Sequence, residues 1–401
     1  MSWPVVSLDS IKASVPYACV GGPFGSNLTS KHYVDEGVPV IRGQNLSGPG
    51  CFNETGFVFV TPEKADKLRP NLAFRGDLLF TQRGTLGQVG LIPQDSQYER
   101  YVVSQSQMKL TVDASRVDAR FVYQYFRLTS TIQEILNRTI TAGVPHINLG
   151  ILKAFEIPLP PLSIQRAIAA VAQNYDDLIA TNQRRIALLE DAARRLYREW
   201  FVHLRFPGHE LVPVKDGVPD GWERGSLDSA LFLQRGFDLP NGSRIPGDVP
   251  VYASTGINGF HNEAKAVGPG VVTGRSGTLG QVHYVTKDYW PLNTSLWVKE
   301  FRRVSPIFAY FLLSELKLEQ FNSGASVPTL DRKTVHQASV LVPSSEVVTQ
   351  FDALIQPLFD QIEILKSSIA TNSQARDLML PKLMSGQLDV SGIALPDEVG
   401  A

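Results

Sequence analysis

Two arginines stand beside copies of the same glycine turn. The stretch Gly84-Thr-Leu-Gly-Gln-Val89 recurs letter for letter at 277–282, and Arg83 and Arg275 lie just before the two copies, one position apart in register. Guanidinium groups can hydrogen-bond two atoms of a base edge at once, and glycine lets a backbone approach a ligand closely. These loops are therefore candidates for nucleic-acid contact. The alternative is a glycine-stabilised hairpin with ordinary solvated arginines, and the identical glycine pattern favours a structural role for the turn itself.

Other polar residues stand near short predicted strands of the two copies and extend this set. Such side chains could touch bases or phosphates. A polar turn, or hydrogen bonding at a strand edge, would explain them as well. The further candidates are Arg42, Gln44, Asn45, Gln82, Thr85, Gln105, Gln107 and His146 in the first copy, and Arg235, Ser254, Thr255, Asn258, Ser276, Thr278, Asn293 and Thr294 in the second.

The sequence contains no pattern typical of a catalytic site. The sequence has no phosphate-binding Gly-x4-Gly-Lys-Ser/Thr loop, no HExxH pair, no Cys/His metal spacing, no Gly-x-Ser-x-Gly and no Asn/Asp-Pro-Pro-Tyr/Phe motif of amino-methyltransferases. Carboxylates such as Asp77, Asp95 and Glu99 could belong to a metal-dependent nuclease, but the second copy does not repeat them. We expect no catalytic residue, no metal site and no cofactor in this chain.

The glycine turns belong to a duplicated module. Matches between the copies keep the same order from Trp3 and Trp222 to Pro160 and Pro343, and the offset shrinks steadily from 219 to 183. A single duplication explains this trend, whereas chance matches would scatter the offsets. Each copy is predicted to contain a Trp-led strand, short glycine-punctuated strands, a helix capped by Asp118 or Ser305, and a final strand.

A long helix is predicted after each module. Residues 163–206 contain neither proline nor glycine, and apolar residues recur there in steps of three and four, with a slip around Asn182. A similar seam follows over 344–386, where Pro357 predicts a kink or a helix that restarts. The narrow seams favour mutual packing as a coiled coil over the alternative, core helices of two separate bundles.

Composition limits the class of protein. A chain of 401 residues with 43% apolar residues suits two or three globular domains. Its formal net charge of −1 means that any anion-binding surface must be local. The sequence has two cysteines, no signal-peptide pattern and no apolar stretch long enough to span a membrane. We therefore expect a cytoplasmic protein.

The whole chain resembles the specificity subunits of type I restriction–modification systems. The resemblance rests on the alternation of modules and long helices, on the repeated glycine turn, and on the stretches 157–165 (IPLPPLSIQ), 22–26 (GPFGS) and 37–42 (GVPVIR). It adds Phe24 and Ser26 to the candidate DNA contacts. The second copy has Gly236-Phe237-Asp238 in place of the Phe-Gly-Ser motif.

The resemblance implies an α+β fold: two tandem mixed α/β target-recognition domains separated by two long helices that form an antiparallel coiled coil. The expected segments are a first recognition domain over 1–160, a central helix over 161–206, a second recognition domain over 207–342, a distal helix over 343–390 and a tail over 391–401. Each domain would read one half of a bipartite, asymmetric sequence in double-stranded DNA, and the helices would fix the spacing between the halves.

The resemblance also implies partners. Two adenine methyltransferase (modification) subunits would dock on the helical regions, and restriction-translocase subunits would join them. The interface candidates are Arg184, Arg195 and Trp200, although a run of arginines is also typical of a solvated helix face. S-adenosylmethionine, ATP and magnesium are expected in the partners. The alternative function is a non-enzymatic structural adaptor that binds protein or glycan through two β-rich domains.

Overall fold

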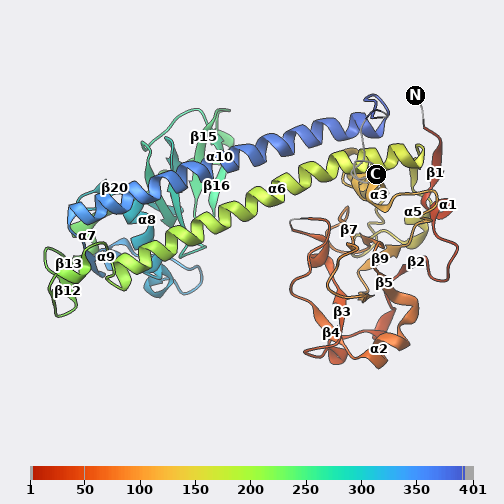
Figure 1. The fold of residues 1–401 in the computed structure, drawn as a ribbon, viewed down its shortest axis with the longest axis horizontal. Coiled ribbons are helices and arrows are strands. Elements are labelled where there is room, and N and C mark those ends of the chain that lie inside the picture. Colours follow the sequence, from red (N-terminus) through yellow and green to blue (C-terminus); the bar gives the residue numbers. More distant parts are fainter. Residues whose placement is uncertain (1–2, 49, 391, 393–401) are drawn as a thin grey trace. The chain divides into compact units, whose positions relative to one another are not determined.

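The computed structural model describes residues 3–48, 50–390 and 392. Contacts divide the chain into two compact units, Met1–Arg184 with Leu365–Ala401, and Arg185–Ile364. The division runs through two long helices, α6 (Leu162–Tyr197) and α10 (Ser345–Met384), so each of them contributes to both units (Figure 1). The five expected segments, in contrast, give each long helix a segment of its own, and their boundaries stay predictions.

The first unit holds two four-stranded sheets. One has the strand order β2-β9-β6-β7 and the other β4-β3-β8-β5, and the first and last strands, β1 and β10, pair separately. The strands are β1 (Val5–Ser7), β2 (Cys19–Gly21), β3 (Val38–Ile41), β4 (Val58–Val60), β5 (Leu72–Phe74), β6 (Leu78–Thr81), β7 (Val89–Leu91), β8 (Arg100–Val103), β9 (Gln107–Leu110) and β10 (Glu156–Pro158). The short helices are α1 (Leu8–Ile11), α2 (Pro62–Lys67), α3 (Ala119–Phe126), α4 (Thr129–Asn137) and α5 (Leu149–Lys153).

The second unit repeats this plan. Its main sheet has the order β14-β20-β17-β18, a second sheet has the order β16-β15-β19, and β13 pairs with β21. The strands are β11 (Val214–Lys215), β12 (Val218–Pro219), β13 (Glu223–Ser226), β14 (Leu231–Arg235), β15 (Val249–Ala253), β16 (Gly256–His261), β17 (Gly270–Gly274), β18 (Val282–Val285), β19 (Trp290–Pro291), β20 (Ser295–Phe301) and β21 (Ser339–Val342). The short helices are α7 (Leu227–Ala230), α8 (Pro306–Glu315) and α9 (Arg332–His336). The shared strand order confirms the predicted duplication.

The predicted helix caps are confirmed in both units. The Asp118 carboxylate accepts a hydrogen bond from the N–H of Arg120 at 2.8 Å at the start of α3. The Ser305 hydroxyl accepts one from the N–H of Phe308 at 3.0 Å at the start of α8. Each helix then buries aromatic side chains, Phe121 and Phe308 among them, against its main sheet. The caps thus fix where each core helix begins.

The long helices pair in an antiparallel sense. In the first unit the Asn182 amide donates to the Ser368 hydroxyl at 3.2 Å, and Asp176 pairs with Arg376 at 2.6 Å. Higher numbers on α6 therefore match lower numbers on α10. In the second unit, Trp200 packs on Phe351 with ring centroids 5.7 Å apart. A polar pair such as Asn182–Ser368 in an apolar seam favours one register over others.

Pro357 does not interrupt α10. The helix continues from Ser345 to Met384, so the expectation of a restart is wrong. A proline inside a helix leaves the carbonyl four residues earlier, that of Ala353, without its donor. Both residues are exposed, so water can satisfy that carbonyl.

The central helix ends differently from the prediction. Helix α6 stops at Tyr197, and a π-helical turn, Arg198–Val202, follows in place of regular helix to residue 206.

Candidate nucleic-acid interface

Three loops meet beside the glycine turn of the first unit. The N–H groups of Gln82 and Arg83 donate to the carbonyl of Ser106 at 2.7 and 3.2 Å. The N–H of Ile147 donates to the carbonyl of Gln82 at 3.1 Å, and Arg83 forms a β-bridge with His146. Predicted candidates that are far apart in the sequence therefore lie together at the end of β6.

The second unit builds the same scaffold with other side chains. The N–H groups of Arg275 and Ser276 donate to the carbonyl of Thr294 at 2.9 and 3.1 Å, and the N–H of Leu330 donates to the carbonyl of Arg275 at 2.8 Å. This register makes Arg275 the equivalent of Gln82 and Ser276 the equivalent of Arg83. The two arginines thus occupy neighbouring positions of a common scaffold and are not equivalent to each other.

The repeated glycines hold the turns in the left-handed region. Gly84 and Gly277 have φ values of +101° and +90°, and Gly87 and Gly280 have +84° and +83°. Residues with a Cβ rarely adopt this conformation, so the repeated turn is structural in both units. The Arg83 and Thr85 side chains beside it are exposed, whereas the equivalent Ser276 and Thr278 are half-buried.

Several predicted contact residues are turned inward. Asn45 is fully buried, and its amide accepts from the Arg42 N–H at 2.9 Å and donates to the carbonyls of Asn53 and Thr55. Its hydrogen-bonding groups are thus used inside the loop, so predicting it as a ligand contact is wrong. Gln107 and Ser254 are also buried, and the same correction applies to them.

Other candidates are more accessible and also support their own loops. Arg42 and Gln44 both donate to the carbonyl of Gly56. The Gln105 amide donates to the carbonyls of Gly25 and Leu28, and so holds the loop that presents Phe24, whose side chain is 86% exposed, and Ser26. His146 is half-buried.

The remaining candidates of the second unit also differ in accessibility. Arg235 and Thr255 are exposed, Asn258 bonds Arg244, and Asn293 donates to Asp238. The Thr294 hydroxyl is buried without a hydrogen-bond partner among the described residues. One residue absent from the predicted set, Arg332, borders a cavity together with Arg235 and Arg275. The only sequence signal for Arg332 is its place directly after Asp331, a residue type that often caps a helix.

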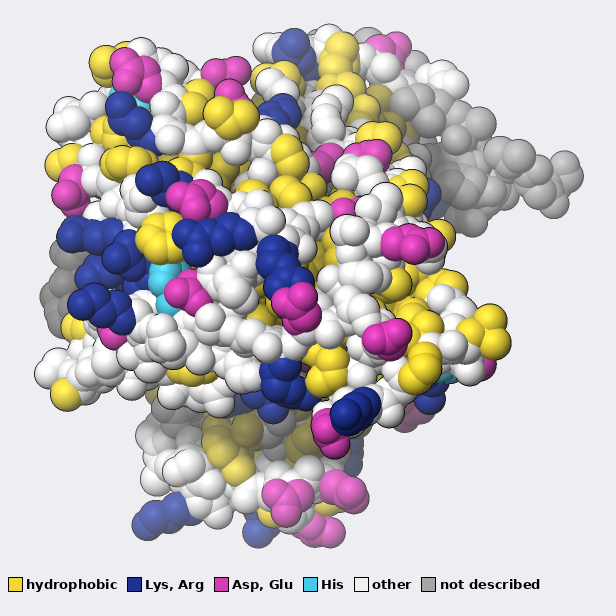
Figure 2. Space-filling view, turned by 90° about the vertical axis from the view of Figure 1, so that its left-hand side faces the viewer, with side chains coloured by type: hydrophobic (Ala, Val, Ile, Leu, Met, Phe, Trp, Pro, Cys, Tyr) yellow, Lys and Arg dark blue, Asp and Glu magenta, His cyan; other side chains and the backbone are white. Residues whose placement is uncertain are grey.

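The helix candidates separate into surface and core. Arg184 and Arg195 are exposed on α6, and Arg195 pairs with Asp191 at 2.7 Å. Trp200 is only 5% exposed and packs on Phe201 and Phe351, so its assignment to a partner interface is wrong. The seam position of this tryptophan, which the periodicity already indicates, explains its burial. Figure 2 shows one face of the molecule, where Lys and Arg side chains gather with carboxylates among them.

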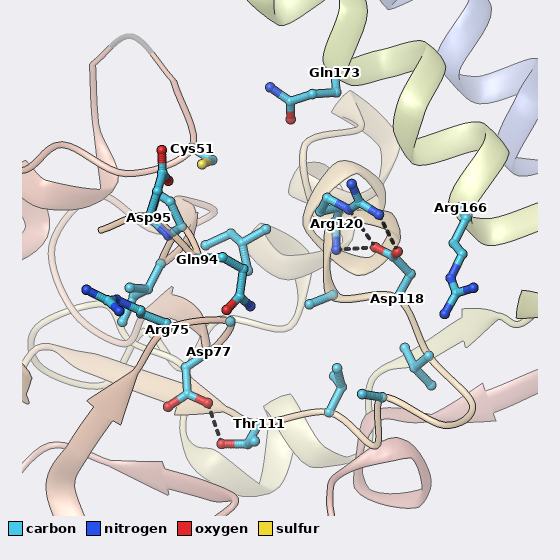
Figure 3. A pocket seen from close by; sticks show the side chains of 18 of the residues that line it. Cys51, Arg75, Asp77, Gln94, Asp95, Thr111, Asp118, Arg120, Arg166 and Gln173 are labelled. Carbon is cyan, nitrogen blue, oxygen red and sulfur yellow. Dashed lines mark hydrogen bonds and ion pairs between the residues drawn. The ribbon is translucent and has the colours of Figure 1, made fainter. Parts of the chain in front are cut away.

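A cavity of about 790 Å³ lies in the first unit (Figure 3). Two of the three carboxylates in its lining form ion pairs: Asp77 pairs with Lys109 at 3.1 Å and bonds Thr111, and Asp118 pairs with Arg120 at 2.9 Å. Within the described parts of the chain, no group of three or more His, Cys, Asp or Glu residues could hold a metal ion. No described helix combines the length and apolar character needed to cross a membrane.

Comparison with known proteins shows what this chain is similar to. A family model described as the type I restriction modification DNA specificity domain matches residues 26–191. The chain is 25% identical over 404 aligned residues to the MjaIX type I restriction enzyme specificity subunit of Methanocaldococcus jannaschii, with 92% of this chain and 91% of that protein covered. The chain thus carries a match to this specificity domain, and it is similar over nearly its whole length to a type I restriction specificity subunit.

Two further proteins of this kind are similar to the chain. The EcoprrI specificity subunit of Escherichia coli is 21% identical over 277 residues, which cover 64% of this chain and 66% of that protein. The crystal structure of a type I restriction–modification S subunit from M. genitalium aligns with a TM-score of 0.62 at 19% identity and covers 96% of both chains. This likeness confirms the predicted fold class of mixed α/β modules with long helices.

Proposed function

We propose that this specificity subunit reads a bipartite, asymmetric sequence in double-stranded DNA and directs adenine methyltransferase and restriction subunits to it. The observation that carries the proposal is the pair of equivalent loop scaffolds with different side chains, Gln82-Arg83 in one unit and Arg275-Ser276 in the other. Sequence recognition needs side chains that meet base edges and others that hold the scaffold on the backbone, and the two pairs can divide these roles differently. Two equivalent scaffolds with different side chains suit two different half-sites.

The chemistry is assigned to partner subunits. Two methyltransferase subunits would bring S-adenosylmethionine, and restriction-translocase subunits would bring ATP and magnesium. The exposed arginines of α6, Arg184 and Arg195, support docking on the helices, because they lie on a face that is not needed for the seam. This assembly would work in the cytoplasm, where the host DNA is.

Mapping adenine methylation in the host genome tests the function. The map is compared for the native strain, a strain with this chain deleted, and a deletion strain that carries the chain on a plasmid. We expect one split, asymmetric motif to lose methylation on deletion and to regain it on complementation. An unchanged methylome in a strain whose methyltransferase is expressed and active would contradict the proposal.

A further inference from the structure

Three arginines from separate elements border one cavity of the second unit. The cavity has a volume of about 570 Å³ and is lined by Arg235 at the end of β14, Arg275 just after β17 and Arg332 at the start of α9. The hydroxyl residues Ser323, Thr329 and Thr334 line it as well. We call this cavity, with its three arginines, the arginine groove.

Neighbouring groups hold the guanidinium groups in place without neutralising all of them. Arg235 forms a long ion pair of 3.8 Å with the exposed Asp238. Arg275 donates to the carbonyl of Asn293 at 3.4 Å, and Arg332 stacks on the Phe232 ring at 5.3 Å. Stacking and a carbonyl contact position a guanidinium but leave its charge intact.

The acidic residue in the lining, Asp331, already accepts hydrogen bonds from its own helix. The Asp331 carboxylate accepts hydrogen bonds from the N–H groups of Lys333 and Thr334 and from the Thr334 hydroxyl at 2.9 Å. These bonds, that of the Thr334 side chain first, lower the pKa of Asp331. Asp331 therefore caps α9, and with three arginines against one carboxylate the lining keeps a net positive charge.

The first unit has no such groove at the equivalent positions. Arg235 pairs with Leu296 of β20, and Gly21 pairs with Met108 of β9. Because Leu296 and Met108 hold equivalent positions in equivalent strands, Arg235 is the equivalent of Gly21. The loop hydrogen bonds match Arg275 with Gln82, and the helix caps Asp331 and Asn148 match Arg332 with Leu149. Three cationic positions of one unit are thus uncharged in the other.

We propose that the arginine groove seats one backbone phosphate of the half-site read by the second unit, an inference that rests on the proposed function. Guanidinium groups bind phosphate oxygens with paired, charge-assisted hydrogen bonds, and hydroxyls at the rim can add donors. A phosphate contact fixes position and carries no sequence information. The groove therefore makes the second unit an electrostatic anchor, while the first unit lacks this contact.

The test uses the complex of this chain with its methyltransferase on the target found by methylation mapping. Arg235→Gln, Arg275→Gln, Arg332→Gln and the triple variant are compared with Lys215→Gln, which removes an exposed charge of the same unit outside the groove. Each single groove variant should weaken binding about tenfold. The triple variant should also lower the slope of log K against log salt by about 1 and leave the methylated sequence unchanged.

A second measurement locates the phosphate. Neutral methylphosphonate is placed at successive positions of the second half-site. One position should weaken binding by the wild-type complex and have no effect on the triple variant, as for two groups that interact directly. Arg275→Lys should keep the slope of log K against log salt that the wild-type complex shows, since the charge is retained.

Three results would overturn the inference. Groove variants with the affinity and salt slope of Lys215→Gln would mean that the groove meets no phosphate. Relaxed sequence preference at one base of the second half-site in Arg275→Gln would mean that the groove reads a base. A wild-type complex without sequence preference would instead overturn the proposed function, and this inference with it.

Discussion

At the scale of single residues, Arg83 is the clearest base-reading candidate of the first unit, because it is exposed beside a rigid glycine turn. We expect Arg83→Ala to weaken target binding by about 1–3 kcal/mol and to relax one position of the first half-site. Lys67→Ala, which removes an exposed charge on α2, is the matched control. Uniform weakening over all sequences would indicate a phosphate contact, and no effect would make Arg83 a solvated side chain.

A buried ion pair gives a residue-scale prediction on stability. Lys109 and Asp77 pair at 3.1 Å with side chains only 5% and 3% exposed. Lys109→Met leaves a buried carboxylate without its counter-charge, and we expect the free energy of unfolding to fall by about 3–5 kcal/mol. The exposed pair Lys12–Asp9 offers the control, since Lys12→Met should cost far less stability than Lys109→Met. Urea unfolding curves measure both, and equal losses would contradict the prediction.

At the scale of elements, Asp176 joins three helices of the first unit. Its carboxylate on α6 bonds Arg127 at the end of α3 and Arg376 on α10. Burial alone would raise the pKa of Asp176. The hydrogen bond and charge of Arg127, together with the hydrogen bonds of Gln124 and Arg376, outweigh burial and lower this pKa below its ordinary value of 3.8. The ionised carboxylate therefore stabilises the folded state.

This linkage predicts a pH dependence. Asp176 contributes its stabilisation above pH 3.8, the ordinary value, and loses it as the pH falls through the lowered pKa of the folded state. We expect Asp176→Asn to lower the thermal unfolding midpoint at pH 7 and to lose less stability than wild type on acidification. Asp177→Asn, an exposed neighbour on the same helix, is the control. Parallel pH profiles for Asp176→Asn and wild type would contradict the prediction.

Elements were more predictable from the sequence than contacts because their signals are local. The Asp118 and Ser305 caps act within three residues, and the helix seams repeat within one segment. The inward turn of Asn45 depends on carbonyls 8 and 10 residues away, and the groove position of Arg332 depends on strands about 60 to 100 residues earlier in the sequence. Such tertiary packing leaves no local pattern to read.

At the scale of the whole molecule, the repeated architecture predicts separable readout. Exchanging residues 207–342 for the corresponding segment of another family member should change only one half of the methylated motif. This segment includes both strands of the β13–β21 pair, and its core packs on Tyr197, Trp200 and Phe351 of the helices. Donors with matching residues at that boundary should fold best. Methylation mapping measures the outcome, and a change in both halves would contradict modular readout.

The division of the helices has a consequence for synthesis. The core of the first unit includes Leu380, Leu383 and Met384 from the end of α10, whereas the second unit is complete by Ile364. A growing chain therefore finishes the domain it began second before it can finish the one it began first. A premature stop just after residue 364 would leave the second unit complete. The first unit, although its sequence begins at the other end of the gene, would lose part of its core.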